Sequence, residues 1–112
     1  MKLSRIIEVL DAEVYTHCKD LDMTFQHGKA SDLLSDVLRF PAENSLLLTG
    51  LMNLQVVRTA EMLDIKGIVF VRDKKPSQGI IDLADGLGII LMGTRYNLYK
   101  SCGLLYHYGL MD

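Results

Sequence analysis

Three short apolar runs, each separated from the next by a helical pattern, constrain the fold more than any other feature of the sequence. They cover residues 45–49, 67–71 and 89–92, which is the length of a strand rather than of a helix. Runs that are apolar throughout indicate strands buried on both faces, because a strand with one wet face alternates apolar and polar residues. Buried strands that alternate with helices are joined by right-handed crossovers. The sequence therefore predicts an α/β fold, a three-layer sandwich with a mainly parallel central sheet.

The segments between and around these runs carry helix and short-strand signals. Residues 2–10 are predicted to form a helix, because their apolar side chains recur at helical spacing. Residues 13–16 and 23–26 alternate like short strands, on either side of a polar turn at Lys19–Asp20. Four further helices follow side chains that can accept hydrogen bonds from unpaired first-turn amides. They are residues 32–38 after Ser31, ended by Pro41; a helix from Asn53 to about Leu63; one from Ser77 to Gly86 or Gly88; and one from Thr94 or Asn97 to about Tyr106.

Composition limits the class of protein. The 112 residues are 49% hydrophobic and 23% charged, which excludes disorder and fits one domain spanning residues 1–112. The formal net charge of −2 gives no reason to expect a nucleic-acid partner, because binding to its phosphate backbone usually needs a concentrated basic surface. No apolar stretch is long enough for a membrane span or a signal-peptide core, and Cys18 and Cys102 fit two free thiols, so we expect a cytoplasmic protein. A mean hydropathy of +0.18 favours self-association.

The motifs of catalysis and cofactor binding are missing from the sequence. There is no phosphate-binding G-x-x-x-x-G-K-[ST] loop, and Gly86-Leu87-Gly88 precedes a strand, so it ends a helix instead of binding a dinucleotide. No G-x-S-x-G elbow and no cluster with metal-ligand spacing is present. Asp32 and Asp36 lie one helical turn apart, but the helix dipole favours acids near a helix N-terminus without any catalysis. We therefore expect no catalytic residue, no metal, no cofactor and no enzymatic activity.

A ligand is expected at the carboxyl ends of the parallel strands, where helix N-termini present free amides. Three loops meet there, at residues 49–53, 72–75 and 93–96. Their basic side chains and hydroxyls suit a phosphate or a carboxylate, and a tyrosine is available to stack on a base. The alternative is that these residues are helix caps and solvated loop charges. The residues of the expected site are Thr49, Gly50, Asn53, Arg72, Lys74, Thr94, Arg95 and Tyr96.

Four stretches of the sequence resemble one family. SDLLSDVL at 31–38, LLLTG at 46–50, VVRTAE at 56–61 and GTRY at 93–96 are similar to the DRTGG-domain family, over nearly the whole chain. Such domains resemble the N-terminal domain of HPr kinase/phosphorylase and a regulatory segment of phosphate acetyltransferases. The resemblance implies an HPr kinase N-terminal-domain-like fold and a non-catalytic regulatory or dimerisation module. The Asp-Arg and Thr-Gly-Gly residues that give the family its name are replaced by LMN at 51–53 and RDK at 72–74. A ligand that those residues bind in other members is therefore not expected for this chain on the strength of the resemblance.

Tyrosines gather in the last 17 residues of the chain. If Leu98, Cys102 and Leu105 form the core face of the last helix, Tyr99 and Tyr106 fall beside that face. Tyrosine suits an interface, because its ring gives a large contact area while few rotamers are frozen. We therefore expect a dimer interface at Tyr99 and Tyr106; the alternative is that both rings cover the edge of the core.

Two functions from different classes remain open. In the first, the domain is a regulatory sensor that binds a nucleotide or another small anion at the expected site. In the second, it is a homodimeric assembly module that docks on a metabolic enzyme or regulator and binds no small molecule. Neither function involves a nucleic acid or a membrane.

Overall fold

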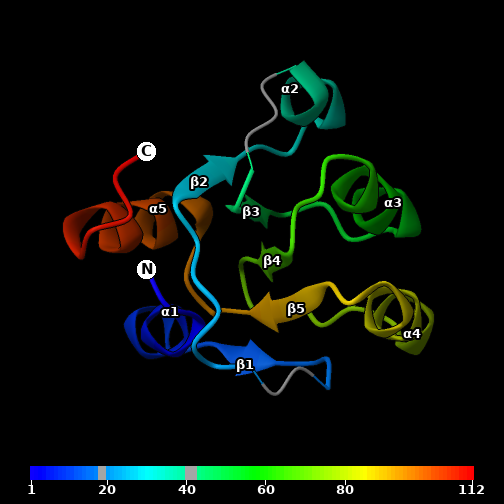
Figure 1. Ribbon diagram of the computed structural model, residues 1–112, viewed down its shortest axis with the longest axis horizontal. Coiled ribbons are helices and arrows are strands. Elements are labelled where there is room, and N and C mark those ends of the chain that lie inside the picture. Colours follow the sequence, from blue (N-terminus) through cyan, green and yellow to red (C-terminus); the bar gives the residue numbers. More distant parts are fainter. Residues whose placement is uncertain (18–19, 40–42) are drawn as a thin grey trace.

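A five-stranded sheet with helices on both faces forms the protein, as the computed structural model shows (Figure 1). The structure describes residues 1–17, 20–39 and 43–112. In chain order the elements are α1 (Leu3–Leu10), β1 (Glu13–Val14), β2 (His27–Ala30), α2 (Leu34–Arg39), β3 (Ser45–Thr49), α3 (Leu54–Met62), β4 (Gly67–Phe70), α4 (Gln78–Leu87), β5 (Ile90–Gly93) and α5 (Leu98–His107).

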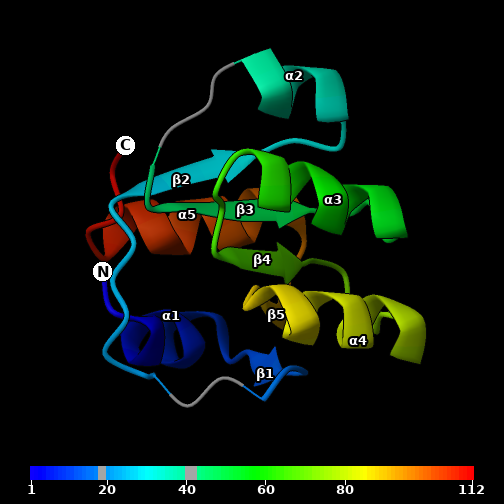
Figure 2. The same ribbon diagram turned by 45° about the vertical axis from the view of Figure 1, so that its right-hand side comes forward.

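The sheet is mixed and follows the order β1-β5-β4-β3-β2. β2, β3, β4 and β5 pair in parallel, and β1 pairs with β5 antiparallel. The parallel strands are joined through α2, α3 and α4, and successive crossovers of the same hand place these helices on one face. α1 and α5 cover the other face (Figures 1 and 2). The predicted α/β fold with a mainly parallel central sheet is confirmed.

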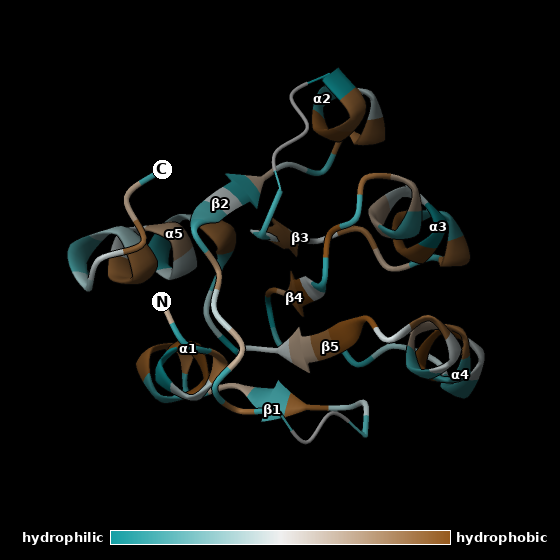
Figure 3. Cartoon of the chain, viewed as in Figure 1, coloured by the Kyte–Doolittle hydropathy of each residue, from teal (hydrophilic) through white to brown (hydrophobic). Residues whose placement is uncertain are grey.

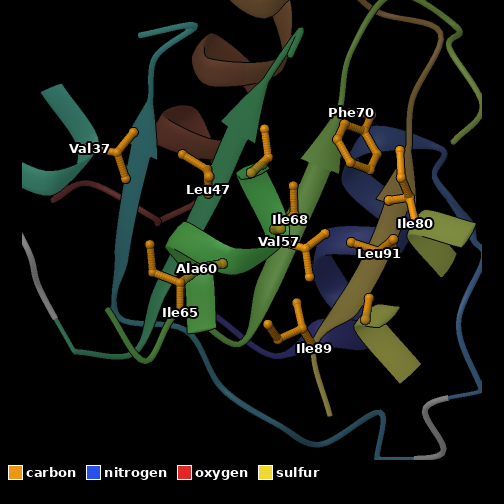
Figure 4. Packing of buried hydrophobic residues seen from close by; sticks show 12 residues of the cluster. Val37, Leu47, Val57, Ala60, Ile65, Ile68, Phe70, Ile80, Ile89 and Leu91 are labelled. Carbon is orange, nitrogen blue, oxygen red and sulfur yellow. The ribbon is translucent and has the colours of Figure 1, made fainter. Parts of the chain in front are cut away.

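Two hydrophobic clusters, one on each face of the sheet, explain the apolar runs. Every position of β3, β4 and β5 is buried. Side chains alternate along a strand, so in β4 Ile68 packs toward α3 and α4, whereas Val69 packs toward α1 and α5. Leu47 and Leu91 join Ile68 in the first cluster (Figure 4). Strands buried on both faces are what a continuous apolar run predicts.

The edge strand β2 departs from the prediction. Residues 23–26, predicted as a strand, form an isolated bridge between Thr24 and Lys2, and the paired strand is His27–Ala30 instead. Each residue of β2 is half-buried or exposed, and hydrophilic residues mark the strand in Figure 3. An edge strand lacks a neighbour on one side, so part of it stays in water and no apolar run forms. The first strand is also shorter than predicted, at Glu13–Val14.

Side-chain caps begin three helices, as predicted. Asn53, Ser77 and Asn97 each accept a hydrogen bond from the amide three residues further on. Gly88 ends α4 in the left-handed region, with a φ of 71°. Ser31 Oγ accepts a hydrogen bond from the Leu33 amide. α2 begins at Leu34, two residues later than the predicted start at residue 32.

Three of the sequence expectations concern residues outside the described ranges: the thiol of Cys18, the turn at Lys19 and the helix stop at Pro41. Cys102 is a free thiol, and partial burial raises its pKa above the ordinary value. Within the described ranges, no helix is both long enough and apolar enough to cross a bilayer.

A carboxylate of α4 fixes the segment that follows β1. Asp85 Oδ1 accepts from the amide of His17 at 2.8 Å, and Asp85 Oδ2 lies 2.7 Å from His17 Nδ1. The hydrogen bond from the amide is the main reason that the pKa of Asp85 lies below its ordinary value. His17 therefore has a structural contact with the end of α4, away from the carboxyl ends of the parallel strands.

Candidate anion-binding site

Loops from three strands meet at the edge of the sheet where the parallel strands end. The Asp73 amide donates to Thr94 O at 2.9 Å, which joins the loops after β4 and β5. Lys74 Nζ donates to Gly50 O at 3.4 Å, which joins the loops after β4 and β3. The parallel topology thus brings these loops into contact at the edge where such sheets bind ligands.

The loop after β4 turns through two residues in the left-handed region. Arg72 has a φ of 67° and Asp73 a φ of 58°, values that residues other than glycine rarely adopt. The Arg72 amide donates to Tyr96 O at 2.9 Å, so backbone hydrogen bonds hold the turn against the β5–α5 loop. The side chains of Arg72 and Lys74 remain exposed. Their charges are therefore available to solutes.

The two hydroxyls of the expected site have partners inside the protein. Thr49 is 1% exposed and Thr94 is 2% exposed. Thr94 Oγ1 donates to Leu10 O at 2.8 Å and accepts from the Tyr96 amide at 3.3 Å. It therefore ties the β5–α5 loop to the end of α1. Asn53, another residue of the expected site, caps α3 by accepting a hydrogen bond from the Val56 amide.

An acidic side chain from the segment between β2 and α2 enters the site. Asp32 Oδ1 accepts from the Gly50 amide at 2.6 Å and from Thr49 Oγ1 at 3.2 Å. Thr49 Oγ1 also accepts from the Leu51 amide at 3.1 Å, so its own hydrogen is free for Asp32. The sequence predicts only a helix-dipole role for Asp32, and its hydrogen bonds to the β3–α3 loop emerge from the structure. The contact with Gly50 joins residues 18 positions apart, which no local pattern reveals.

Two cations at this edge have no carboxylate partner within the described residues. Arg95 pairs with Asp11, but no described carboxylate oxygen lies within 4.0 Å of the charged nitrogens of Arg72 or Lys74. The Arg72 guanidinium lies against Gly50, where a Cβ would overlap Nη2. Glycine at this position leaves room for the guanidinium. We call the five residues that meet here the Gly50 site: Asp32, Thr49, Gly50, Arg72 and Lys74.

Arg95 and Tyr96 contact other parts of the protein. Arg95 Nη2 lies 3.5 Å from Asp11 Oδ2, and its guanidinium carbon lies 5.4 Å from the centre of the Tyr96 ring. Lys100 Nζ lies 4.2 Å from the centre of the same ring. The residues expected to form one site therefore divide into two groups: Thr49, Gly50, Asn53, Arg72 and Lys74 between β3 and β4, and Thr94, Arg95 and Tyr96 toward α1 and α5.

The two tyrosines expected at an interface lie on the outer face of α5. Tyr99 is 90% exposed and Tyr106 is 58% exposed. Both line an open hollow of about 810 Å³ along the helix, together with Cys102 and Gly103. Apart from the chain neighbours of Gly103 and the backbone of its own helix, no described atom lies within 4 Å of a Cβ placed on this glycine. The outer face of α5 is thus open between two exposed aromatic rings.

The fold and the Gly50 site define an α/β domain with a cationic loop cluster at the sheet edge. No family model and no curated protein matches the chain. Among solved structures, it is similar to the regulatory region of Clostridium perfringens pyrophosphatase, which comprises CBS and DRTGG domains and was crystallised with its activator, diadenosine tetraphosphate. The match has a TM-score of 0.72 at 16% identity and covers 93% of this chain but 45% of that chain. This chain therefore shares the fold of part of that regulatory region, and it spans less than half the length of its neighbour.

Proposed function

We propose that this chain is a non-catalytic regulatory domain that binds a nucleotide or another small anion at the Gly50 site. The observation that carries the proposal is a pair of cations, Arg72 and Lys74, that have no carboxylate partner among the described residues. They lie beside the β3–α3 loop, which already binds the Asp32 carboxylate. The Gly50 N–H and the Thr49 O–H both donate to that carboxylate, which supports binding of an oxyanion by the same donors. Charge-assisted hydrogen bonds from cations to phosphate or carboxylate oxygens are the strong ones.

The class of ligand follows from this chemistry and from the structural neighbour. The pyrophosphatase regulatory region was solved with diadenosine tetraphosphate, which is an adenosine nucleotide, as its activator. The resemblance of the sequence to DRTGG domains supports the same regulatory class. Adenine nucleotides are therefore the first ligands to test, with inorganic phosphate and acetyl phosphate beside them.

We expect at least one of these ligands to raise the melting temperature of the protein in a thermal-shift screen. A ligand at 100 times its Kd adds about 2.7 kcal/mol to the free energy of unfolding. Arg72→Ala and Lys74→Ala should each reduce or abolish this shift, because each removes a cation that no described carboxylate neutralises.

Lys66→Ala is the matched control for these two variants. Lys66 Nζ pairs with Asp64 at 2.9 Å, just before β4 begins and thus at the opposite end of that strand. This variant should keep the full ligand-induced shift. A flat response of the wild type across the whole panel, or an equal loss in all three variants, would contradict an anion site at Arg72 and Lys74.

The outer face of α5 favours a second candidate function, which is assembly. In this alternative the chain is a homodimeric module that docks on a metabolic enzyme or regulator and binds no small molecule. Tyr99 and the open position at Gly103 place a large side chain and a space on one helix face. In a two-fold dimer both copies present the same surface, so Tyr99 of each copy can fill the space at Gly103 of the other.

A dimer through this face should appear in sedimentation experiments as a mass that rises with protein concentration. Tyr99→Ser and Tyr106→Ser should shift the equilibrium toward the monomer, because each removes a large aromatic contact. Tyr108→Ser is the control, because Tyr108 contacts Arg5 of α1, with the guanidinium 5.0 Å from its ring centre. A mass that stays monomeric at every concentration would rule out the dimer, and a dimer unaffected by either substitution would place the interface elsewhere.

A further inference from the structure

The Asp32 carboxylate lies where an oxygen of an anionic ligand would lie. Its Oδ1 accepts from two donors of the β3–α3 loop, the Gly50 amide at 2.6 Å and Thr49 Oγ1 at 3.2 Å. It also lies 3.3 Å from the position of a Cβ on Gly50, and Arg72 Nη2 lies against the same position. A ligand that used these donors would have to replace Asp32.

Two cations flank the site, and neither forms an ion pair with the carboxylate that occupies it. Arg72 and Lys74 bring two charges, and no oxygen of Asp32 lies within 4.0 Å of their charged nitrogens. A phosphate monoester carries about −1.5 to −2 charges at pH 7 and three strong acceptor oxygens. It can therefore accept from the loop donors and from the cations at the same time. The site matches a phosphate group better than it matches the side chain that fills it.

The segment that carries Asp32 is held by few buried contacts. Among the described side chains of α2, Val37 is buried and Leu34 is partly buried against the same cluster. Leu33, just before the helix, is 58% exposed, and Leu38 within it is 43% exposed. Segments with few buried apolar contacts separate from the rest of a protein at a small cost in free energy. α2 lies at the β2 end of the sheet, on the far side of the molecule from β1 and β5 (Figures 1 and 2).

We propose that Asp32 is an internal competitor, which occupies the Gly50 site in the empty protein and is displaced, together with α2, by a phosphate group of the ligand. This inference rests on the proposed ligand-binding function and deepens it. It names a phosphate group as the chemistry that the site recognises and α2 as the element that moves. Ligand binding then changes the surface at the β2 edge, which gives the sensor an output that a partner protein can read.

Calorimetric titration of the full chain with inorganic phosphate and with ATP tests the competition. Asp32→Ala removes the competitor, so we expect the affinity for phosphate to rise about tenfold or more, the scale of a hydrogen bond to a charged group. Asp32→Asn keeps an acceptor for the Gly50 amide but lacks the charge, and its affinity should lie between those of Asp32→Ala and the wild type. Asp36→Ala is the matched control, because it removes one acidic charge from α2 itself and should keep the wild-type affinity.

Hydrogen exchange of the wild-type protein follows the displacement directly. Saturating phosphate should speed the exchange of amides in α2 (Leu34–Arg39) and change the environment of the Gly50 amide. In Asp32→Ala, α2 should exchange fast before any phosphate is added. Should both Asp32 variants fail to fold, the wild-type measurement decides the question, and exchange in α2 that does not speed up on phosphate binding overturns the inference.

The outcomes separate this inference from the function on which it rests. Folded Asp32 variants that bind phosphate no more tightly than the wild type would overturn the competition, while binding that still depends on Arg72 would leave the proposed function standing. An equal rise in affinity for Asp36→Ala would also overturn it, because the charge of α2 rather than the position of Asp32 would then set the affinity. If neither the wild type nor any variant binds phosphate or ATP, the inference fails together with the proposed binding of phosphate groups at the Gly50 site.

Discussion

Replacing Phe25 with alanine is expected to lower the free energy of unfolding by about 3–5 kcal/mol, a large part of the stability of a small domain. The ring is 1% exposed and belongs to the cluster that α1 and α5 cover. It lies directly on Gly67, where a Cβ would stand 2.7 Å from Phe25 Cζ and 2.9 Å from Cε1. Alanine leaves a cavity at the start of β4 that the surrounding strands fill only in part. Urea denaturation of the two proteins measures the difference.

The contact between Phe25 and Gly67 gives this prediction its controls. Leu21 precedes Phe25 in the same segment and is 52% exposed, so Leu21→Ala should change the stability by no more than about 0.5 kcal/mol. Gly67→Ala should cost about 1–3 kcal/mol in the wild type, because the new methyl group overlaps the ring. It should cost less when residue 25 is already alanine. Additive effects of the two substitutions would show that the ring does not press on Gly67.

The central strands of the fold could be predicted from the sequence, and the edge strand could not. β3, β4 and β5 are buried on both faces, so their apolar runs are visible without knowledge of their neighbours. β2 owes its place to pairing with β3, and its residues HGKA carry no strand pattern. Phe25 explains the error. It makes the segment before β2 alternate like a strand, yet its ring is buried by packing on Gly67, which is distant in the sequence.

The position of the candidate site could be predicted from the topology, but the contacts of its side chains could not. Parallel topology predicts that the loops after β3 and β4 share an edge, and Lys74 does contact Gly50 there. Which charges remain without a partner depends on single side-chain contacts between distant residues. Arg95 is paired with Asp11 from the end of α1, and Asp32 reaches Gly50 from the segment after β2. Neither pairing leaves a signal in spacing or periodicity, so the sequence alone does not distinguish Arg95 from Arg72 and Lys74.

The substitution Leu105→Ala is expected to cost about 2–5 kcal/mol and to loosen α5 from the sheet. Leu105 is 2% exposed, and Ser101 is the other buried residue of this helix. The helical pattern predicts Leu98, Cys102 and Leu105 as the core face, but Leu98 and Cys102 are half-buried. Leu105 is therefore the one fully buried apolar side chain by which α5, itself wholly described, packs on the sheet. Denaturation with urea, with half-buried Leu104→Ala as the matched neighbour of smaller effect, measures this contribution.

Leu105→Ala also distinguishes the two proposed functions, because it loosens α5, which carries the proposed dimer interface, and leaves the Gly50 site unchanged. α5 packs against α1, β2 and β3, whereas Arg72 and Lys74 lie in the loop after β4. Under conditions in which the variant is still folded, self-association through Tyr99 should weaken, while the ligand-induced thermal shift that depends on Arg72 should persist. If the melting midpoint of Leu105→Ala equals that of the wild type, α5 is held by its flanking loops rather than by its core face. If the variant loses ligand binding while it remains folded, α5 and the Gly50 site are coupled through the sheet, and the two functions belong to one mechanism.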